Sequence, residues 1–275
     1  MDKEIPISVV VCCQNRESTI EQCLKSIKRN NPKEIIIVDG RSSDNTVKIA
    51  KKYTKNILYE NGEGLAHARQ IGAEKVTTKY LAYIDSDVII AKDFLENLFK
   101  ELKKYGWDGI HAQIIGDKAK NYWEWAENQQ FKINFNKVGE RHRIGTIACI
   151  FLTKAIQEEK FDTFFNGAYE DGELCLRLIK KGYKLGVGKT TAIHQHRANF
   201  GNFKKQKIWY GRGGMRMVWK YKNPKYLVAP FFYIFYGSFL ALKNKQPKIV
   251  PYYFFNWFFF TIGMVKEFFV LLRNH

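Results

Sequence analysis

The first part of the chain alternates between short apolar runs and amphipathic segments. Residues 7–12 and 34–39 are apolar runs of strand length, and the second ends in a carboxylate. The first run is followed by a segment whose apolar residues fall on one helical face: Ile20, Cys23, Leu24 and Ile27. Strands that alternate with helices of this length predict an α/β fold, with a mostly parallel sheet covered by helices on both faces.

Capping and turn residues mark the predicted ends of these elements. Residues 18–21, Ser-Thr-Ile-Glu, match a capping box and predict that the first helix begins there. The polar loop at 40–46 provides an N-cap for a second helix, which we expect to run through Tyr53. A short strand is expected at 56–60, followed by a helical segment that contains residues 64–72.

The apolar run at residues 79–90 contains two carboxylates, Asp85 and Asp87. Side chains two apart on an extended segment point the same way, so both are expected to converge beyond the carboxyl end of a buried strand. Ligands bind at that edge in open α/β sheets, and two close carboxylates favour a divalent cation that bridges to phosphates. A simple turn is the alternative interpretation, because Asp and Ser are common turn residues.

The last part of the chain contains two uncharged runs, 226–242 and 249–265, each 17 residues long. This length is at the lower limit for crossing a membrane. A spanning hairpin would translocate the three lysines between the runs, against the positive-inside tendency, so helices lying in the membrane plane are the alternative. Basic and aromatic residues at 203–216 are typical of a surface-lying segment. A third interpretation is a buried helical hairpin of the soluble fold.

The charge distribution separates the two parts. The net charge is +18, and residues 199–275 contain 13 Lys and Arg but a single acid, Glu267. The same residues hold 23 of the 42 aromatic side chains, which favours membrane lipids as a partner. Two domains are predicted, 1–200 and 201–275. A nucleic-acid-binding protein is the competing class, but it predicts a basic groove on the folded domain, so we expect no nucleic-acid partner.

Cysteine usage and the start of the sequence indicate the compartment. Five cysteines without a Cys-x-x-Cys spacing argue against a zinc ribbon or a disulfide framework and favour a reducing environment. The first residues show only a short apolar run and no cleavable signal pattern. A membrane-associated protein with a cytoplasmic catalytic domain is therefore expected.

Several motifs, in order along the chain, resemble the family-2 glycosyltransferases, which have the GT-A nucleotide-diphospho-sugar transferase fold. Residues 9–15 resemble the first strand and nucleotide loop of that family, and residues 38–46 resemble its Val-Asp-Asp-Gly-Ser-x-Asp-Gly-Thr segment. Further matches are 68–72 (ARQIG), 85–87 (DSD), 161–162 (FD), 169–177 (YEDGELCLR), 182–183 (GY) and 194–196 (HQH). The resemblance covers about residues 5–200, and it implies a GT-A catalytic domain followed by membrane-associated helices.

The resemblance implies roles in binding the donor, a nucleotide-diphospho-sugar. Asp39 would bind the nucleotide base, and Arg69 would bind the base or the diphosphate. Gln14 and Asn15 would belong to the nucleotide loop, and Asp85 would contact the ribose. Two departures from the family pattern leave both UDP- and GDP-sugars open as donors: Gly40 and Gln70.

The resemblance also implies a metal site for Mn²⁺ or Mg²⁺. Asp87 would hold the metal together with Asp85, and His196 would complete the coordination. For an isolated pair of histidines on a strand, His194 and His196, a structural role is the alternative.

Two adjacent acids, Glu170 and Asp171, precede a predicted helix with apolar residues at Leu174, Leu178 and Ile179. Acids at a helix N-terminus are favoured by the helix dipole, which is the structural alternative. Transfer of a sugar to a hydroxyl requires removal of a proton, and Asp171 would take it, with Glu170 as its catalytic neighbour. The metal would stabilise the departing diphosphate, so no protein acid is needed there. The resemblance implies inversion of the anomeric centre.

The predicted function is a metal-dependent hexosyltransferase that acts on a hydroxyl of a glycan or lipid-linked saccharide at the membrane. A polyprenyl-phosphate sugar synthase is the alternative, but that group usually lacks the Glu-Asp pair, since a phosphate nucleophile needs no base. Arg143 and Thr146 are further candidate contacts for the donor sugar and acceptor. Trp123 and Trp125 are expected to pack in the protein rather than to stack on a sugar.

Overall fold

The computed structural model describes residues 5–165, 168–195 and 199–273. Its strands are β1 (Ile5–Cys13), β2 (Pro32–Asp39), β3 (Ile57–Tyr59), β4 (Tyr80–Ile84), β5 (Val88–Ile90), β6 (Gly109–Gly116), β7 (Gly139–Glu140), β8 (Ala148–Leu152) and β9 (Leu185–His194). Its α-helices are α1 (Ile20–Lys28), α2 (Thr46–Ala50), α3 (Leu65–Lys75), α4 (Phe94–Tyr105), α5 (Tyr122–Gln130), α6 (Thr153–Glu159), α7 (Glu170–Lys180), α8 (Phe200–Tyr221), α9 (Lys225–Lys243) and α10 (Val250–Arg273). A π-helical turn, Phe131–Phe135, follows α5, and a 3-10 turn, Pro247–Ile249, precedes α10.

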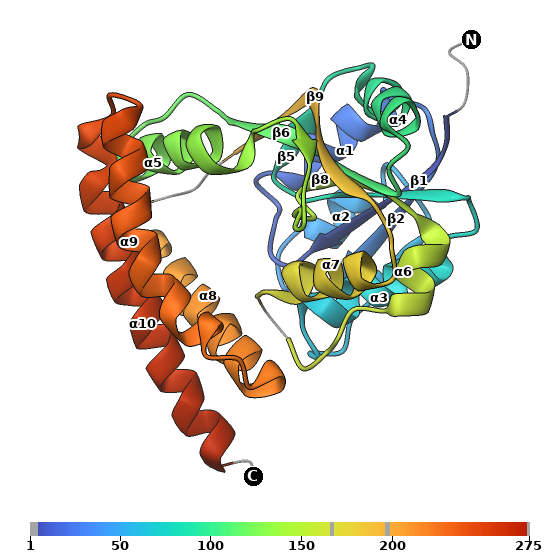
Figure 1. Cartoon of the computed structure of the whole chain (residues 1–275). Coiled ribbons are helices and arrows are strands. Elements are labelled where there is room, and N and C mark those ends of the chain that lie inside the picture. The colour runs from blue at the N-terminus through green and yellow to red at the C-terminus, as the bar shows by residue number, and fades with distance from the viewer. Residues whose placement is uncertain (1–4, 166–167, 196–198, 274–275) are drawn as a thin grey trace.

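One sheet forms the centre of the fold, with the strand order β3-β2-β1-β4-β8-β6-β9-β5 and with β7 paired to β9 (Figure 1). The pairings from β3 to β4 and the pairing of β6 with β9 are parallel. Antiparallel pairs occur where β8 lies between β4 and β6, and where β5 and β7 meet β9. The predicted α/β class and mostly parallel sheet are confirmed, and the antiparallel pairs are an addition that the sequence pattern did not indicate.

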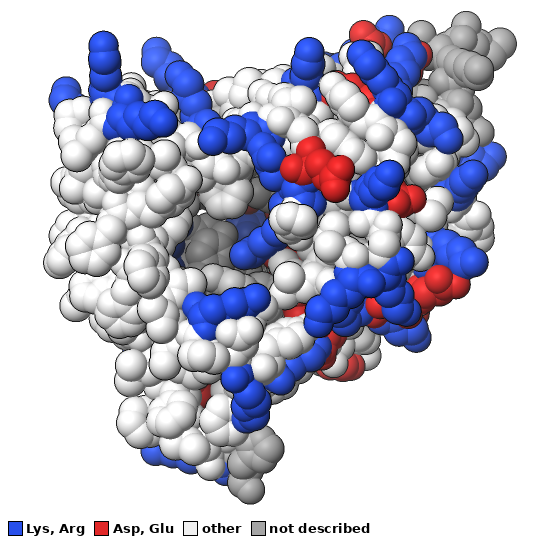
Figure 2. All heavy atoms as spheres, in the orientation of Figure 1, with Lys and Arg blue, Asp and Glu red and all other residues white. Residues whose placement is uncertain are grey.

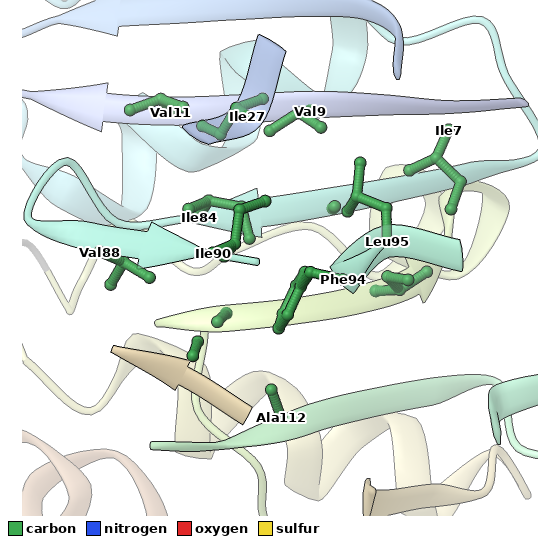
Figure 3. Packing of buried hydrophobic residues seen from close by; sticks show 14 of the residues in the cluster. Ile7, Val9, Val11, Ile27, Ile84, Val88, Ile90, Phe94, Leu95 and Ala112 are labelled. Atoms are coloured by element: carbon green, nitrogen blue, oxygen red, sulfur yellow. The ribbon is translucent and has the colours of Figure 1, made fainter. Parts of the chain in front are cut away.

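Helices cover both faces of the sheet, because successive side chains of a strand point to opposite sides. On β1, Ile7, Val9 and Val11 pack toward α1 and α4, as Figure 3 shows for Ile27, Phe94 and Leu95 of those helices. Val10 belongs to the other face, where it packs with residues of α3, α6 and α7. The uninterrupted apolar run of β1 therefore reflects burial on both faces.

Two predicted helix boundaries were wrong. The helix α1 begins at Ile20 with Thr19 as its N-cap, one residue later than the predicted cap at Ser18. The helix α2 ends at Ala50, before the predicted end, because the next three residues form a turn. Within the run 79–90, β4 ends at Ile84, directly before Asp85, as predicted, and Val88 N–H donates to Asp85 O (3.0 Å) in a turn that leads into β5.

The C-terminal helices α8, α9 and α10 pack on one another and on α5 (Figure 1). The ring of Trp123 stacks on Phe203 with 4.5 Å between centroids, and Trp125 packs against the same cluster. The expectation that both tryptophans serve packing is confirmed. The segment 203–216 is not a freely surface-lying one, since it forms most of α8 and several of its residues are buried: Phe203, Lys207, Gly211, Gly213, Gly214 and Met215.

The fold makes a testable prediction at Gly72, where α3 crosses the sheet closely. A Cβ at Gly72 would lie 2.5 Å from Cγ1 of Val10. We expect Gly72→Ala to lower the free energy of unfolding by about 1–3 kcal/mol, measured by urea denaturation. Helix propensity alone predicts the opposite sign, a gain of up to about 1 kcal/mol. Gly201→Ala, at an exposed helical glycine of α8, is the matched control, and equal stability of the two variants would contradict the steric argument.

Candidate active site

The carboxyl ends of three neighbouring parallel strands form the candidate site. In the pairing of β1 with β2, Cys13 lies opposite Asp39. Gln14 and Asn15 follow β1 directly, and Asp85 follows β4, which pairs with β1 on its other side. The fold therefore brings the predicted nucleotide-binding residues to the edge of the sheet where ligands bind in this class of fold.

Hydrogen bonds hold the loops after β1 and β2 against each other. Gln14 Nε2 donates to Gly40 O (2.7 Å), and the Asn15 N–H donates to Ser42 Oγ (2.8 Å). The Asp39 carboxylate, 1% exposed, accepts hydrogen bonds from the Ser42 N–H (2.8 Å) and the Ser42 hydroxyl (2.6 Å). Asp39 thus fixes the shape of the loop that follows β2.

Arg69 joins this edge of the sheet to α7. Its side chain is 5% exposed, its guanidinium bonds to the Glu170 carboxylate, and its Nη2 lies 3.3 Å from Asp85 Oδ1. The start of α3, which carries Arg69, is held by the Glu60 carboxylate, which accepts a hydrogen bond from the Gly64 N–H (3.0 Å). Burying such charges costs several kcal/mol per ion, and the contact of opposite charges offsets this cost.

Arg69 neutralises only part of the negative charge of the carboxylates around it. Burial raises the pKa of Asp85 to about 6, and Asp87 adds to the shift while Arg69 opposes it. Burial also raises the pKa of Glu170 to about 7, with Asp171 adding and Arg69 opposing. Glu170 Oε2 has no hydrogen-bond partner in the described part of the chain. The cluster therefore holds more negative charge than one guanidinium neutralises.

Asp87 lies in the turn between β4 and β5 and contacts a histidine of β9. His194 Nε2 is 3.1 Å from Asp87 Oδ1, because the antiparallel register places His194 opposite Val88. Burial acts to raise the pKa of Asp87, but the hydrogen bond and charge of His194, together with the charge of Arg16, outweigh it and hold the pKa below its ordinary value. The predicted metal ligand His196 lies outside the described residues.

The pair Asp85 and Asp87 supplies only part of a metal coordination shell. Within residues 5–165, 168–195 and 199–273 there is no group of three or more His, Cys, Asp or Glu that could hold a metal ion. Mg²⁺ and Mn²⁺ are hard cations that often take one or two protein carboxylates and complete their shell with waters and phosphates. Two like-charged, partly buried carboxylates fit such a cation when a phosphorylated ligand is bound with it.

Asp171 lies in the first turn of α7 with its side chain 21% exposed. Arg143 Nη2 is 3.4 Å from Asp171 Oδ1, and the guanidinium lies over the Tyr169 ring, 4.8 Å from its centroid. Tyr169, the N-cap of α7, has φ 72°, a left-handed conformation that is strained for a residue other than glycine. An accessible carboxylate is therefore held between a cation and a constrained turn. Thr146, the other predicted contact, is buried.

His111 on β6 was not among the predicted site residues. This side chain is 7% exposed, and its Nε2 has no hydrogen-bond partner among the residues that the structure describes. A Cβ at Gly145 would lie 3.4 Å from His111 Nε2 and 3.7 Å from Asp171 Oδ2, so the two side chains border the same space. Burial lowers the pKa of His111 to about 4, which keeps the ring neutral at neutral pH. A single histidine in an apolar strand carries no sequence signal for this position.

The buried, neutral His111 should make the stability of the fold depend on pH. Its pKa is about 4 in the folded protein and 6.5 as the ordinary value, so the unfolded chain binds more protons between these values. Stability should therefore fall as the pH falls through this window, by on the order of 3 kcal/mol from His111. Urea unfolding gives the free energy of unfolding at neutral pH and near the lower end of the window. The difference between these two values should be smaller for His111→Gln than for the wild type. The exposed His142→Gln variant serves as the control, and an unchanged pH dependence in His111→Gln would contradict the assignment.

The sheet and the helices on its two faces have the arrangement of the GT-A fold found in glycosyltransferases. The chain belongs to glycosyl transferase family 2, whose family model matches residues 8–163. The family, fold and enzyme class predicted from the sequence are thereby confirmed. Glycosyltransferase GlyG of Streptococcus pneumoniae serotype 4 (strain TIGR4) is 25% identical over 190 residues, which are 62% of this chain and 63% of GlyG. The chain spans less than two thirds of the length of the curated relatives GlyA, EpsH and GlyG.

Two solved structures show the same fold at low sequence identity. Mannosyltransferase PcManGT from Pyrobaculum calidifontis, in complex with GDP-Man and Mn²⁺, has a TM-score of 0.66 and 13% identity, covering 97% of this chain and 88% of that one. S. aureus TarS 1-349 in complex with UDP-GlcNAc has a TM-score of 0.54 and 16% identity, covering 78% of this chain and 67% of that one.

Proposed function

We propose that this glycosyltransferase transfers a hexose from a UDP- or GDP-sugar, with a divalent metal and inversion of the anomeric centre, to a hydroxyl of a glycan or lipid-linked saccharide at a membrane. One observation carries the proposal. Arg69 bonds to both Glu170 and Asp85, so it places the helix that carries Asp171 beside the carboxylates at the end of β4. A donor held at those carboxylates would thus have an accessible carboxylate, Asp171, near its reacting sugar.

The loops after β1 and β2 are proposed to hold the nucleotide. Asp39 would accept hydrogen bonds from the base, and Gln14 and Asn15 would line the nucleotide from the neighbouring loop. Asp85 would contact the ribose, and Arg69 would face the base or the diphosphate. Solved relatives of the same fold bind UDP-GlcNAc and GDP-Man, which supports a nucleotide-sugar donor and leaves both nucleotides in the proposal.

Asp85 and Asp87 are the described residues proposed to hold Mg²⁺ or Mn²⁺, with His196 as a further proposed ligand. When bound, the cation would act as a Lewis acid that offsets charge on the departing diphosphate. His194 contacts one oxygen of Asp87 and so restrains the rotation of that carboxylate. This is the usual way in which neighbouring groups orient a ligand side chain.

Asp171 is proposed to remove the proton from the acceptor hydroxyl. Its carboxylate is accessible, whereas that of Glu170 is buried and bonded to Arg69, so Glu170 is proposed to position the site rather than to take the proton. Arg143 would keep the Asp171 carboxylate oriented. The presence of such a base supports a hydroxyl acceptor over a polyprenyl phosphate, which is already anionic.

The base assignment predicts the effect of Asp171→Asn. Transfer should fall by about 10² to 10⁴-fold, because a general base is lost, while donor binding should stay nearly unchanged. Transfer from a panel of nucleotide sugars to a membrane lipid extract, together with direct donor binding, measures both quantities. Asp93→Asn, at an exposed carboxylate that makes no capping bond at the start of α4, is the control. Full transfer by Asp171→Asn, or polyprenyl phosphate as the sole acceptor, would overturn this proposal.

The metal assignment predicts the effect of Asp87→Ala. This variant should lose metal-dependent turnover and should bind Mn²⁺ more weakly in the presence of UDP or GDP, because a charged oxygen ligand is removed. Circular dichroism checks that the fold is kept, and Asp93→Ala is the control substitution. Metal-independent turnover at the wild-type level in Asp87→Ala would show that the carboxylate has another role.

A further inference from the structure

The hairpin of α9 and α10 is in contact with the catalytic domain near its turn. The hydroxyl of Tyr122 on α5 donates to Lys248 O (3.0 Å) in the turn between the two helices. Farther along, Gln130 Nε2 donates to the hydroxyl of Tyr233 on α9 (2.5 Å). Figure 1 shows α5 beside the end of the hairpin where this turn lies. The turn therefore belongs to the same body as the catalytic domain.

The far end of the hairpin is connected to the catalytic domain through α8. Glu267 of α10 is fully buried and pairs with Arg212 (2.5 Å) and Arg216 (2.6 Å) of α8. Lys220, near the end of α8, pairs with Asp162 (2.6 Å) and Glu173 (2.5 Å) of the catalytic domain. Ion pairs thus connect α10 to α8, and α8 to the catalytic domain.

Small residues bring α8 and α10 into backbone contact. A Cβ at Gly211 would lie 1.9 Å from Phe260 O, and a Cβ at Gly263 would lie 2.0 Å from Ile208 O. Only glycine fits at such a crossing. The hairpin cannot separate from α8 without losing these contacts, so its orientation follows that of the catalytic domain.

The outward side of the hairpin is apolar and exposed. Both helices are long and apolar enough to cross a membrane. Only 11% of an 18-residue apolar stretch of α9 is buried, and only 28% of such a stretch within Pro247–Arg273. The exposed apolar side chains on this side, called the apolar face below, are Leu227, Val228, Phe231, Phe232, Phe235, Tyr236, Phe239, Leu242, Phe254, Phe258, Val265, Phe268, Phe269 and Leu272. A contiguous patch of this kind marks an interaction surface.

Charge identifies the occupant of the apolar face. Residues 199–275 contain 13 Lys and Arg and one acid, Glu267. Four of these cations are paired inside the protein, and the others carry the excess charge: Lys207, Arg212, Arg216 and Lys220 are the paired ones. Figure 2 shows uncharged atoms over the side of the molecule formed by these helices, with Lys and Arg gathered along its upper edge. An apolar face with a basic edge matches an anionic lipid bilayer, whose headgroups attract the cations while its acyl region accepts the aromatic rings.

A spanning arrangement conflicts with the contacts at both ends of the hairpin. If α9 and α10 crossed a bilayer, the turn with Lys243 and Lys248 would lie about 30 Å from the catalytic side. In the structure that turn contacts α5. Arg212, with 47% of its side chain exposed, and the pair Lys207–Glu127 would also be placed at the depth of the hydrocarbon, where charges are costly.

We infer that the apolar face of α9 and α10 lies flat in one leaflet of an anionic bilayer, and that the hairpin turn stays on the same side of the membrane as the catalytic domain. The inference is independent of the proposed transfer reaction, because it rests on the packing of α5, α8 and the hairpin. Of the two arrangements considered from the sequence, spanning and in-plane helices, it favours the in-plane one.

The first test measures binding of the full chain to vesicles by flotation. Binding should be stronger for vesicles that contain phosphatidylglycerol than for pure phosphatidylcholine. Phe232→Glu and Phe235→Glu, at positions 68% and 74% exposed, should lower binding by about tenfold or more with unchanged thermal unfolding. Tyr59→Glu, at a position 51% exposed on β3, is the matched control and should bind like the wild type. Flotation that is unchanged in both Phe variants, with conversion of a dimer to a monomer in gel filtration, would show that a second copy covers the face and would overturn the inference.

The second test separates the in-plane from the spanning arrangement. Lys243→Cys near the turn and Lys55→Cys on the catalytic domain are exposed positions, whereas the native cysteines are buried or half-buried, so the unsubstituted chain gives the background. After the protein binds preformed vesicles, both introduced thiols should react with a membrane-impermeant maleimide added outside. Protection of Lys243→Cys until detergent is added would mean that the turn has crossed the bilayer, and the inference would be wrong.

Discussion

The buried guanidinium of Arg69 is the interaction on which the arrangement of the site depends. It lies between Glu170 on α7 and Asp85 after β4, two residues from distant parts of the sequence. Removing one partner from a buried ion pair typically costs about 3–5 kcal/mol, because the other charge stays buried. Arg69 therefore fixes the helix that carries Asp171 against the edge of the sheet. The tight packing of Gly72 on Val10 holds the helix that supplies the guanidinium.

The same interaction leaves the site short of positive charge. One guanidinium faces Asp85 and Glu170, and the pKa values of both are raised by burial, to about 6 and about 7. A divalent cation alone would more than neutralise the excess negative charge. A diphosphate alone would increase it. Binding the two together changes the net charge of the site least, which gives a physical reason why cation and donor would bind as a unit.

Much of the fold could be predicted from the sequence because strand ends are local features. Asp39 and Asp85 each follow an apolar run, and parallel strands bring such ends together whatever their order. The contacts of Arg69 with Glu170, of Asp87 with His194, and of His111 beside Asp171 depend on long-range pairing, which no local pattern contains. The burial of α8 was missed for the same reason, since its basic residues resemble surface ones until their acidic partners are found.

The packing of the C-terminal helices reaches the turn that precedes the candidate base. A Cβ at Gly213 of α8 would lie 2.4 Å from Ala168 O, and the ring of Phe260 on α10 lies 6.2 Å from that of Tyr169. Tyr169 adopts its left-handed conformation directly before Glu170 and Asp171. If the apolar face rests in a bilayer, these contacts set the height of Asp171 above the membrane through packed side chains rather than through a flexible linker. An acceptor anchored in the same leaflet would then need to search for the base in two dimensions only.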